Sequence, residues 1–143
     1  MRTTMMLVAT FAVFGLWFNG TANAEEHVGP HKGTIVEWGD EEYHLELVTD
    51  AKAGTATIYV YGGEEDLKKG TAKPIDAKAL IMALKTKPAT TVKFDAKPTK
   101  DDPAGKASQF VAKNDVFAIE MKLEGTVSGK VGTKPYSGDF KQK

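Results

Sequence analysis

Cysteine is absent from this chain of 143 residues, and its absence excludes several kinds of site. Without cysteine the chain has no disulfide, no zinc–thiolate site, no thiol nucleophile and no lipid attachment of the lipoprotein type. The fold must therefore be stabilised by its apolar core alone.

An excess of positive charge is also missing. Nineteen basic and nineteen acidic side chains give a formal net charge of zero. Proteins that bind nucleic acids or anionic membrane surfaces present a basic face. The charge balance therefore argues against both kinds of partner.

Catalytic motifs are missing as well. No serine lies in a Gly-x-Ser-x-Gly sequence. Residues 125–130 (GTVSGK) lack the spacing of a phosphate-binding loop and fit a glycine-punctuated hairpin better. The acidic clusters at 41–42, 64–66 and 101–102 are typical of solvated turns. We therefore expect a protein that is not an enzyme.

The amino-terminal segment has the three parts of a secretory signal peptide. Arg2 precedes an uncharged, mostly apolar run at residues 5–18, and Ala22-Asn23-Ala24 supplies a cleavage site. The run is shorter than the roughly 20 apolar residues of a spanning helix, although an uncleaved membrane anchor is the alternative. Removal of residues 1–24 of the 143 leaves 119 residues, enough for one domain, and removes the one arginine from a neutral chain, leaving a net charge of −1.

The first two predicted strands form a hairpin. Residues 34–38 (TIVEW) and 43–48 (YHLELV) flank the turn cluster 39–42 (GDEE), and the second run alternates apolar and polar side chains. The predicted register pairs Trp38 with Tyr43, Glu37 with His44 and Ile35 with Glu46, for a loop of either four or two residues. The core face then carries Val36, Trp38, Tyr43, Leu45 and Leu47, and the opposite face carries Glu37, His44 and Glu46.

The remaining chain predicts further short strands separated by turns. Residues 25–33 suggest an extended arm, 62–73 a charged connection and 97–108 a long loop. Residues 77–86 favour a buried strand over a helix, whereas 116–123 fit a strand or a short helix equally well. Strands are expected at 55–61, 90–96, 109–112, 126–131 and 136–141. The pattern predicts an all-β, Ig-like antiparallel β-sandwich over residues 34–143.

Cleavage after Ala24 would create a first candidate metal site. The new amine of Glu25, two deprotonated backbone amides and the imidazole of His27 would place four nitrogens in a plane around one ion. Such ligation suits Cu(II) or Ni(II). A shift of the cleavage position by one residue would abolish it.

The hairpin offers a second candidate site. His44 and Glu46 are two residues apart on one strand, so they point the same way about 6.5–7 Å apart. Glu37 lies on the neighbouring strand, and His31 would join them if the arm folded back. Imidazole with carboxylate suits Zn, Cu or Ni. The alternative is that His44 and Glu46 simply face water.

Two segments of the chain carry a resemblance to known proteins. Residues 29–34 (GPHKGT) and 41–48 (EEYHLELV) resemble a Pro-His-Gly-Gly … Tyr-His-x-Glu pattern. The pattern occurs in small secreted bacterial proteins of the planctomycete type, which largely lack an assigned activity. The segments are also similar to His-bearing segments near the start of periplasmic adaptor subunits of heavy-metal efflux systems. Residues 73–78 (KPIDAK) and 102–110 (DPAGKASQF) extend the likeness.

This resemblance implies an exported domain and, through the adaptor segments, metal handling. His31, His44 and Glu46 match the pattern by position, whereas His27 lies outside it. Lys32 departs from the pattern, which has glycine there. Its cation beside His31 weakens the case for a metal at that histidine.

The leading hypothesis is a periplasmic or secreted binding module for Cu, Ni or Zn that acts as a carrier, buffer or sensor. Its metal ligands would be His31, His44 and Glu46, with Glu37 and His27 as auxiliary ligands. The alternative is an exported domain that binds a periplasmic protein partner, with neither a metal nor catalysis.

Overall fold

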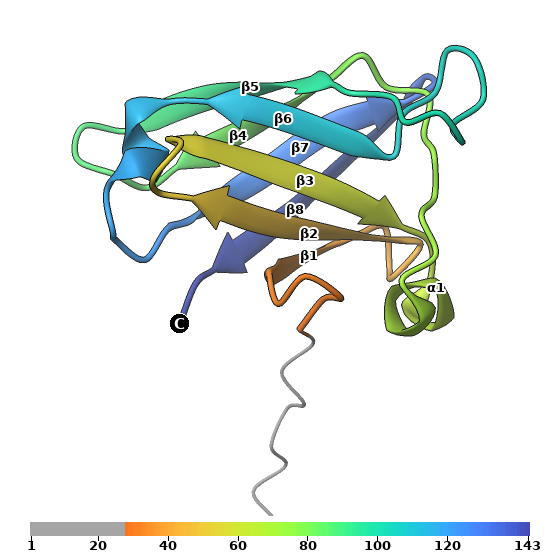
Figure 1. Cartoon of the computed structure of the whole chain (residues 1–143), viewed down its shortest axis with the longest axis horizontal. Helices are drawn as coiled ribbons and strands as arrows, with labels where there is room; N and C mark the ends of the chain where they lie inside the picture. Colours follow the sequence, from red (N-terminus) through yellow and green to blue (C-terminus); the bar gives the residue numbers. More distant parts are fainter. Residues whose placement is uncertain (1–27) are drawn as a thin grey trace, which may run out of the picture.

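The computed structural model describes residues 28–143. The predicted signal peptide, residues 1–24, and His27 lie outside the described residues. The described chain forms eight strands, one short α-helix and one 3-10 helix (Figure 1). The strands are β1 (Thr34–Trp38), β2 (Tyr43–Asp50), β3 (Thr55–Tyr61), β4 (Ala79–Leu84), β5 (Thr90–Ala96), β6 (Gln109–Lys113), β7 (Glu124–Val131) and β8 (Lys134–Lys141), with α1 (Glu64–Lys69) after β3 and η1 (Asp115–Ala118) after β6.

All strand pairs are antiparallel and belong to one sheet in the order β1-β2-β3-β6-β5-β4-β7-β8. The sheet folds over so that β1, β2, β3 and β6 lie in front of β4, β7 and β8 (Figure 1). Only two residue pairs, Asp95–Val111 and Ala96–Phe110, join β5 to β6. The predicted single all-β antiparallel domain is confirmed.

The first and last strands bring the sheet close to closure. A Cβ atom at Gly138 of β8 would overlap the carbonyl oxygen of Glu37 in β1. The indole of Trp38 donates a hydrogen bond of 3.0 Å to the carbonyl of Val127, and its ring stacks on Tyr136 at 5.5 Å. Side-chain packing therefore holds the two edges together.

The core lies between the two layers and follows the alternation of the strands. The side chains of Trp38, Leu45, Ile58, Phe94 and Phe110 are fully buried within it. The ring of Phe94 in β5 packs edge to face against that of Phe117 in η1, with centroids 5.9 Å apart. Burying each large apolar side chain contributes about 1.5–3 kcal/mol, and this burial replaces the disulfides that the chain lacks.

The first hairpin has the predicted register. Trp38 pairs with Tyr43, Glu37 with His44 and Ile35 with Glu46, through the four-residue loop. Gly39, Asp40 and Glu41 all have positive φ, and Glu42 N–H donates to the carbonyl of Gly39 at 3.0 Å. The core-face prediction is also confirmed, since Val36, Trp38, Leu45 and Leu47 are buried and Tyr43 is half-buried.

Two segments that the sequence left open are now assigned. Residues 79–84 form a strand, as favoured. Residues 115–118 form a 3-10 helix, and 119–123 are irregular, which leaves Ile119 and Met121 exposed and Leu123 buried.

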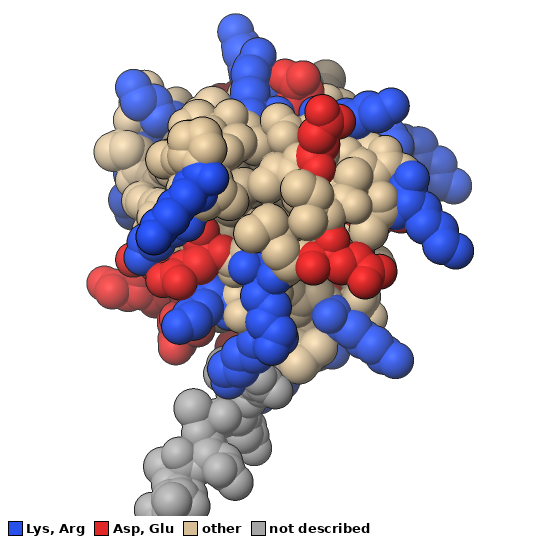
Figure 2. All heavy atoms as spheres, turned by 90° about the vertical axis from the view of Figure 1, so that its left-hand side faces the viewer, with Lys and Arg blue, Asp and Glu red and all other residues tan. Residues whose placement is uncertain are grey.

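Figure 2 views the left-hand end of Figure 1, where lysines project around the rim with carboxylates among them. No helix within residues 28–143 is long and apolar enough to cross a membrane.

The charged connection after β3 contains an unpredicted helix, α1. Glu64 and Lys68 pair at 2.6 Å one turn apart, acidic residues occupy its first turn, and lysines occupy its last. Gly70 ends it in the left-handed conformation. These features stabilise a short helix, and Leu67 anchors it by being buried.

Candidate functional site

The amino-terminal arm folds back onto β2 through a tight turn. Lys32 N–H donates to the carbonyl of Gly29 at 2.8 Å, and Val28 forms a bridge with Thr34. Lys32 has φ of 60°, a left-handed conformation that disfavours residues with a Cβ atom. The turn brings His31 over the outer face of the sheet.

Close packing of the arm depends on two glycines. A Cβ atom at either Gly29 or Gly33 would overlap the side chain of Glu46. The absence of side chains at these positions lets the backbone approach the carboxylate directly. The glycines at the two ends of the Gly-Pro-His-Lys-Gly sequence therefore leave room for the Glu46 carboxylate beneath the arm.

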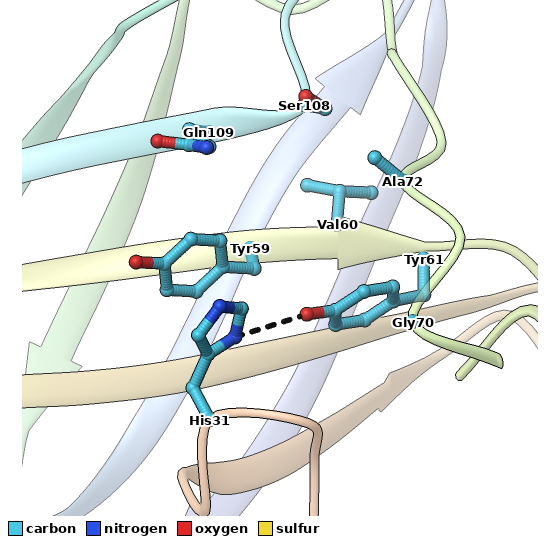
Figure 3. Close-up of a pocket in the computed structure, with 8 residues that line it drawn as sticks. All are labelled: His31, Tyr59, Val60, Tyr61, Gly70, Ala72, Ser108 and Gln109. Atoms are coloured by element: carbon cyan, nitrogen blue, oxygen red, sulfur yellow. Dashed lines mark hydrogen bonds between the residues drawn. The ribbon is translucent and has the colours of Figure 1, made fainter. Parts of the chain in front are cut away.

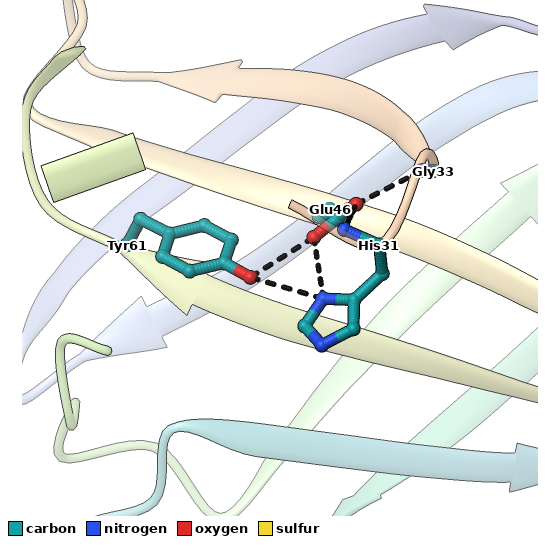
Figure 4. Close-up of polar contacts among 4 residues, drawn as sticks. All are labelled: His31, Gly33, Glu46 and Tyr61. Atoms are coloured by element: carbon teal, nitrogen blue, oxygen red, sulfur yellow. Dashed lines mark hydrogen bonds and ion pairs between the residues drawn. The ribbon is translucent and has the colours of Figure 1, made fainter. Parts of the chain in front are cut away.

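Glu46 is a fully buried carboxylate whose two oxygens accept four hydrogen bonds (Figure 4). Oε1 accepts from the backbone N–H groups of His31 at 2.7 Å and Gly33 at 2.9 Å. Oε2 accepts from Tyr61 Oη at 2.9 Å and contacts His31 Nδ1 at 2.9 Å. Because a buried charge is costly unless it is paired and hydrogen-bonded, these donors are what allow a carboxylate at this position.

The contact with Glu46 fixes the orientation of the His31 ring and the nitrogen that faces the carboxylate. A carboxylate only accepts hydrogen bonds, so Nδ1 carries the proton and donates it to Oε2. In the neutral imidazole Nε2 then has the free lone pair, and it lies on the side of the ring away from Glu46 (Figure 4). The ring stacks on Tyr59 at a centroid distance of 3.9 Å, and 45% of the side chain is exposed.

Tyr61 completes the network from β3. Its hydroxyl donates to Glu46 and lies 3.2 Å from His31 Nδ1. Burial, followed by the hydrogen bond to Glu46, raises the pKa of Tyr61 well above its ordinary value of 10. The hydroxyl therefore keeps its proton, and remains a hydrogen-bond donor to Glu46, into the alkaline range.

A pocket of about 170 Å³ opens beside this network (Figure 3). His31, Tyr59 and Tyr61 line one side of it, and Ser108 and Gln109 line the other (Figure 3). The volume suits an ion with its waters or a very small ligand, and the imidazole is the basic group that borders it.

His44 and Glu37 do not join His31 and Glu46. His44 is buried, and its Nδ1 lies 2.8 Å from the carbonyl of Gly62, at the start of the connection to α1. Glu37 is exposed. The interpretation that His44 and Glu46 face water is wrong. The connection at Gly62 covers His44, and the amino-terminal arm covers Glu46. His31 and Glu46 are the two predicted ligands that the fold brings into contact.

Within residues 28–143, no three His, Cys, Asp or Glu side chains converge in a way that could hold a metal ion. Glu46 does not fit the role of a direct ligand, since each of its oxygens already accepts two hydrogen bonds. His31 Nε2 does fit it.

Sequence reasoning missed Tyr59 and Tyr61. In the β2–β3 register, Tyr59 is opposite Glu46 and Tyr61 is opposite His44. Extending the predicted hairpin by one strand would have placed both rings on the face of His44 and Glu46, because paired residues share a face.

Comparison of the chain with models of protein families, with curated proteins and with solved structures finds no significant match.

Proposed function

We propose that this protein is an exported binding module for a divalent transition metal, Cu, Ni or Zn, with Nε2 of His31 as a ligand. The observation that carries the proposal is the 2.9 Å contact between His31 Nδ1 and the fully buried Glu46. Histidines that bind metals commonly donate their other ring N–H to a carboxylate, which fixes the tautomer and makes the free nitrogen more basic.

The proposal changes the roles of the residues first considered. Glu46 orients the imidazole, and Tyr61 and the backbone N–H groups of His31 and Gly33 hold Glu46 in place. His44 supports the connection to α1, and Glu37 is left without a role at the metal. The metal would bind where His31 borders the pocket, beside the ring of Tyr59.

One imidazole is a weak site, so other ligands are required. We assign them to the residues before Val28, namely His27 and the amine that cleavage after Ala24 would free at Glu25. His27 lies four residues before His31 in the sequence. Neutral nitrogen ligands of this kind suit Cu(II), Ni(II) and Zn(II). The module would act as a carrier, buffer or sensor.

Isothermal titration of the mature protein with Cu(II), Ni(II) and Zn(II) tests the proposal. Binding tighter than about 100 µM, equivalent to ~5.5 kcal/mol, is expected for at least one ion, and His31→Ala should weaken it. Failure of all three ions to bind would overturn the proposal. Mass spectrometry of the secreted protein checks the second part, because any start other than Glu25 places the free amine on another residue and changes its spacing to His27.

Glu46→Gln is the sharpest variant. Its carbonyl oxygen can accept from the backbone N–H groups of His31 and Gly33, while its amide faces His31 Nδ1 and Tyr61 Oη. Nδ1 must then accept a hydrogen bond, so the ring proton moves to Nε2 and blocks the metal. We expect a folded protein whose affinity falls about 10–100-fold, whereas the exposed control Glu37→Gln should bind as the wild type does.

The second candidate is a domain that binds a periplasmic protein partner, without metal or catalysis. The absence of a three-residue ligand group within residues 28–143 favours it. In that case the His31–Glu46 pair serves only to fasten the arm. Titrations in which none of the three ions binds, with the arm still ordered, would support this candidate.

A further inference from the structure

A second pocket is lined by residues of the segments that precede β4 and β6, together with the first residue of β2 and the last of β7. Its volume is about 350 Å³, within the roughly 300–1,000 Å³ range of small-molecule sites. We call it the end pocket and define it by Tyr43, Lys73, Ile75, Asp76, Lys106 and Val131. Three regions singled out in the sequence meet here, namely residues 41–48, 73–78 and 102–110.

Backbone hydrogen bonds tie the walls of the end pocket together. Ile75 and Ala107 exchange two hydrogen bonds, of 2.9 and 3.0 Å. Gly132 N–H, in the turn between β7 and β8, donates to the carbonyl of Asp76 at 2.8 Å. The pocket is therefore formed before any ligand enters, which lowers the entropic cost of binding.

The lining combines an apolar surface with uncompensated cations. Tyr43, Ile75 and Val131 are buried or half-buried, whereas Lys73 and Lys106 are exposed. Elsewhere Lys85 pairs with Glu124 at 3.0 Å and Lys134 with Glu42 at 3.1 Å. No carboxylate of residues 28–143 forms such a pair with Lys73 or Lys106.

We propose that the end pocket binds a small organic anion, a carboxylate carried on an apolar or aromatic body. Two lysines, Lys73 and Lys106, and one carboxylate, Asp76, line the pocket, so its charged lining residues carry a net positive charge. The ligand carboxylate would bind between the two ammonium groups, and its body would rest on Tyr43, Ile75 and Val131. The site is independent of the metal proposal, because neither His31 nor Glu46 lines it.

Phenylacetate is a suitable probe, followed by chemical shifts of the backbone amides. Saturable shifts are expected at Tyr43, Ile75, Lys106 and Val131, with at least fivefold weaker binding of phenylacetamide, which lacks the charge, and of acetate, which lacks the body. Shifts centred elsewhere, equal binding of phenylacetamide, or no saturation below about 10 mM would overturn the proposal.

A double variant, Lys73→Met with Lys106→Met, tests the role of the cations. Both side chains are exposed, so the fold should survive, and the dispersion of the amide spectrum verifies this. Affinity for phenylacetate should fall at least about tenfold, toward that of phenylacetamide. Lys113→Met, an exposed lysine on β6, is the matched control and should bind as the wild type does. Equal effects of the double variant and the control would contradict the proposed contacts.

Discussion

Truncation of Glu46 to alanine is the perturbation that the structure predicts most sharply. The change removes the acceptor of four hydrogen bonds and leaves the N–H groups of His31 and Gly33, the His31 ring and the Tyr61 hydroxyl without their partner. A hydrogen bond to a charged group contributes about 1.5–3 kcal/mol. Water can reach the half-exposed His31 side chain but not Tyr61, which is 2% exposed.

Partial compensation by water brings the expected loss to about 3–5 kcal/mol of the free energy of unfolding, the range for breaking a buried charged pair. At about 3–4 °C per kcal/mol for a domain of this size, the melting temperature should fall by roughly 10–20 °C. Total stabilities are about 5–15 kcal/mol, so the variant should be marginal but folded.

Urea denaturation followed by the fluorescence of the buried Trp38 measures this loss. Hydrogen exchange adds a local readout, because the amides of His31 and Gly33 should lose protection before those of the core strands. Glu37→Ala is the matched control on the neighbouring strand, and its exposed side chain should change stability by less than about 0.5 kcal/mol. A loss below about 1 kcal/mol for Glu46→Ala, or unchanged protection of both arm amides, would contradict the role of Glu46 in fastening the arm.

Three further predictions concern single side chains. Lys32→Gly should raise the free energy of unfolding by about 1 kcal/mol in urea titrations, because glycine adopts the left-handed conformation without strain; a loss of stability would contradict this account of the turn. Tyr61→Phe should lower it by about 1.5–3 kcal/mol. Since the pKa of Tyr61 is raised by burial and by Glu46, its stabilisation is complete below pH 10 and is lost as the pH rises further, so the variant should be less alkali-sensitive than the wild type in pH-dependent melting. Burial opposes ionisation of Asp102, but hydrogen bonds from Thr99 and Ser108 outweigh it and lower the pKa of Asp102 below 3.8. The ionised carboxylate therefore stabilises the fold above that pH, and this stabilisation is lost in stronger acid. Asp102→Asn should remove this loss of stability in acid, and an unaltered acid profile would show that the loop does not depend on the carboxylate.

Much of the fold could be predicted from the sequence because strand alternation is local. The register of β1 and β2 followed from the turn cluster and the apolar spacing, and the buried residues of the hairpin followed from the register. The helix α1 was missed because Glu64–Lys69 is dominated by charges. Its i, i+4 pairing and its terminal glycine were the available signals.

The candidate site was only partly predictable, for a physical reason. Alternation indicates which face of β2 carries His44 and Glu46, but not whether another segment covers that face. Covering depends on the contacts of the arm with Glu46 and of the connection at Gly62 with His44, and these join residues that are distant in the sequence. The sequence predicted that His31 would approach Glu46 if the arm folded back. It did not predict that His44 would be buried separately from them.

The seam between β1 and β8 has a consequence for the order of folding. The carbonyl that accepts the hydrogen bond of Trp38 belongs to Val127, which is 89 residues later in the chain. Glu42 accepts a hydrogen bond from Tyr136, which is 94 residues later. Such contacts form only after large loops close, which slows folding. A chain that has emerged only as far as β6 still lacks both partners of its first hairpin. The domain can therefore close only when its last strand has arrived.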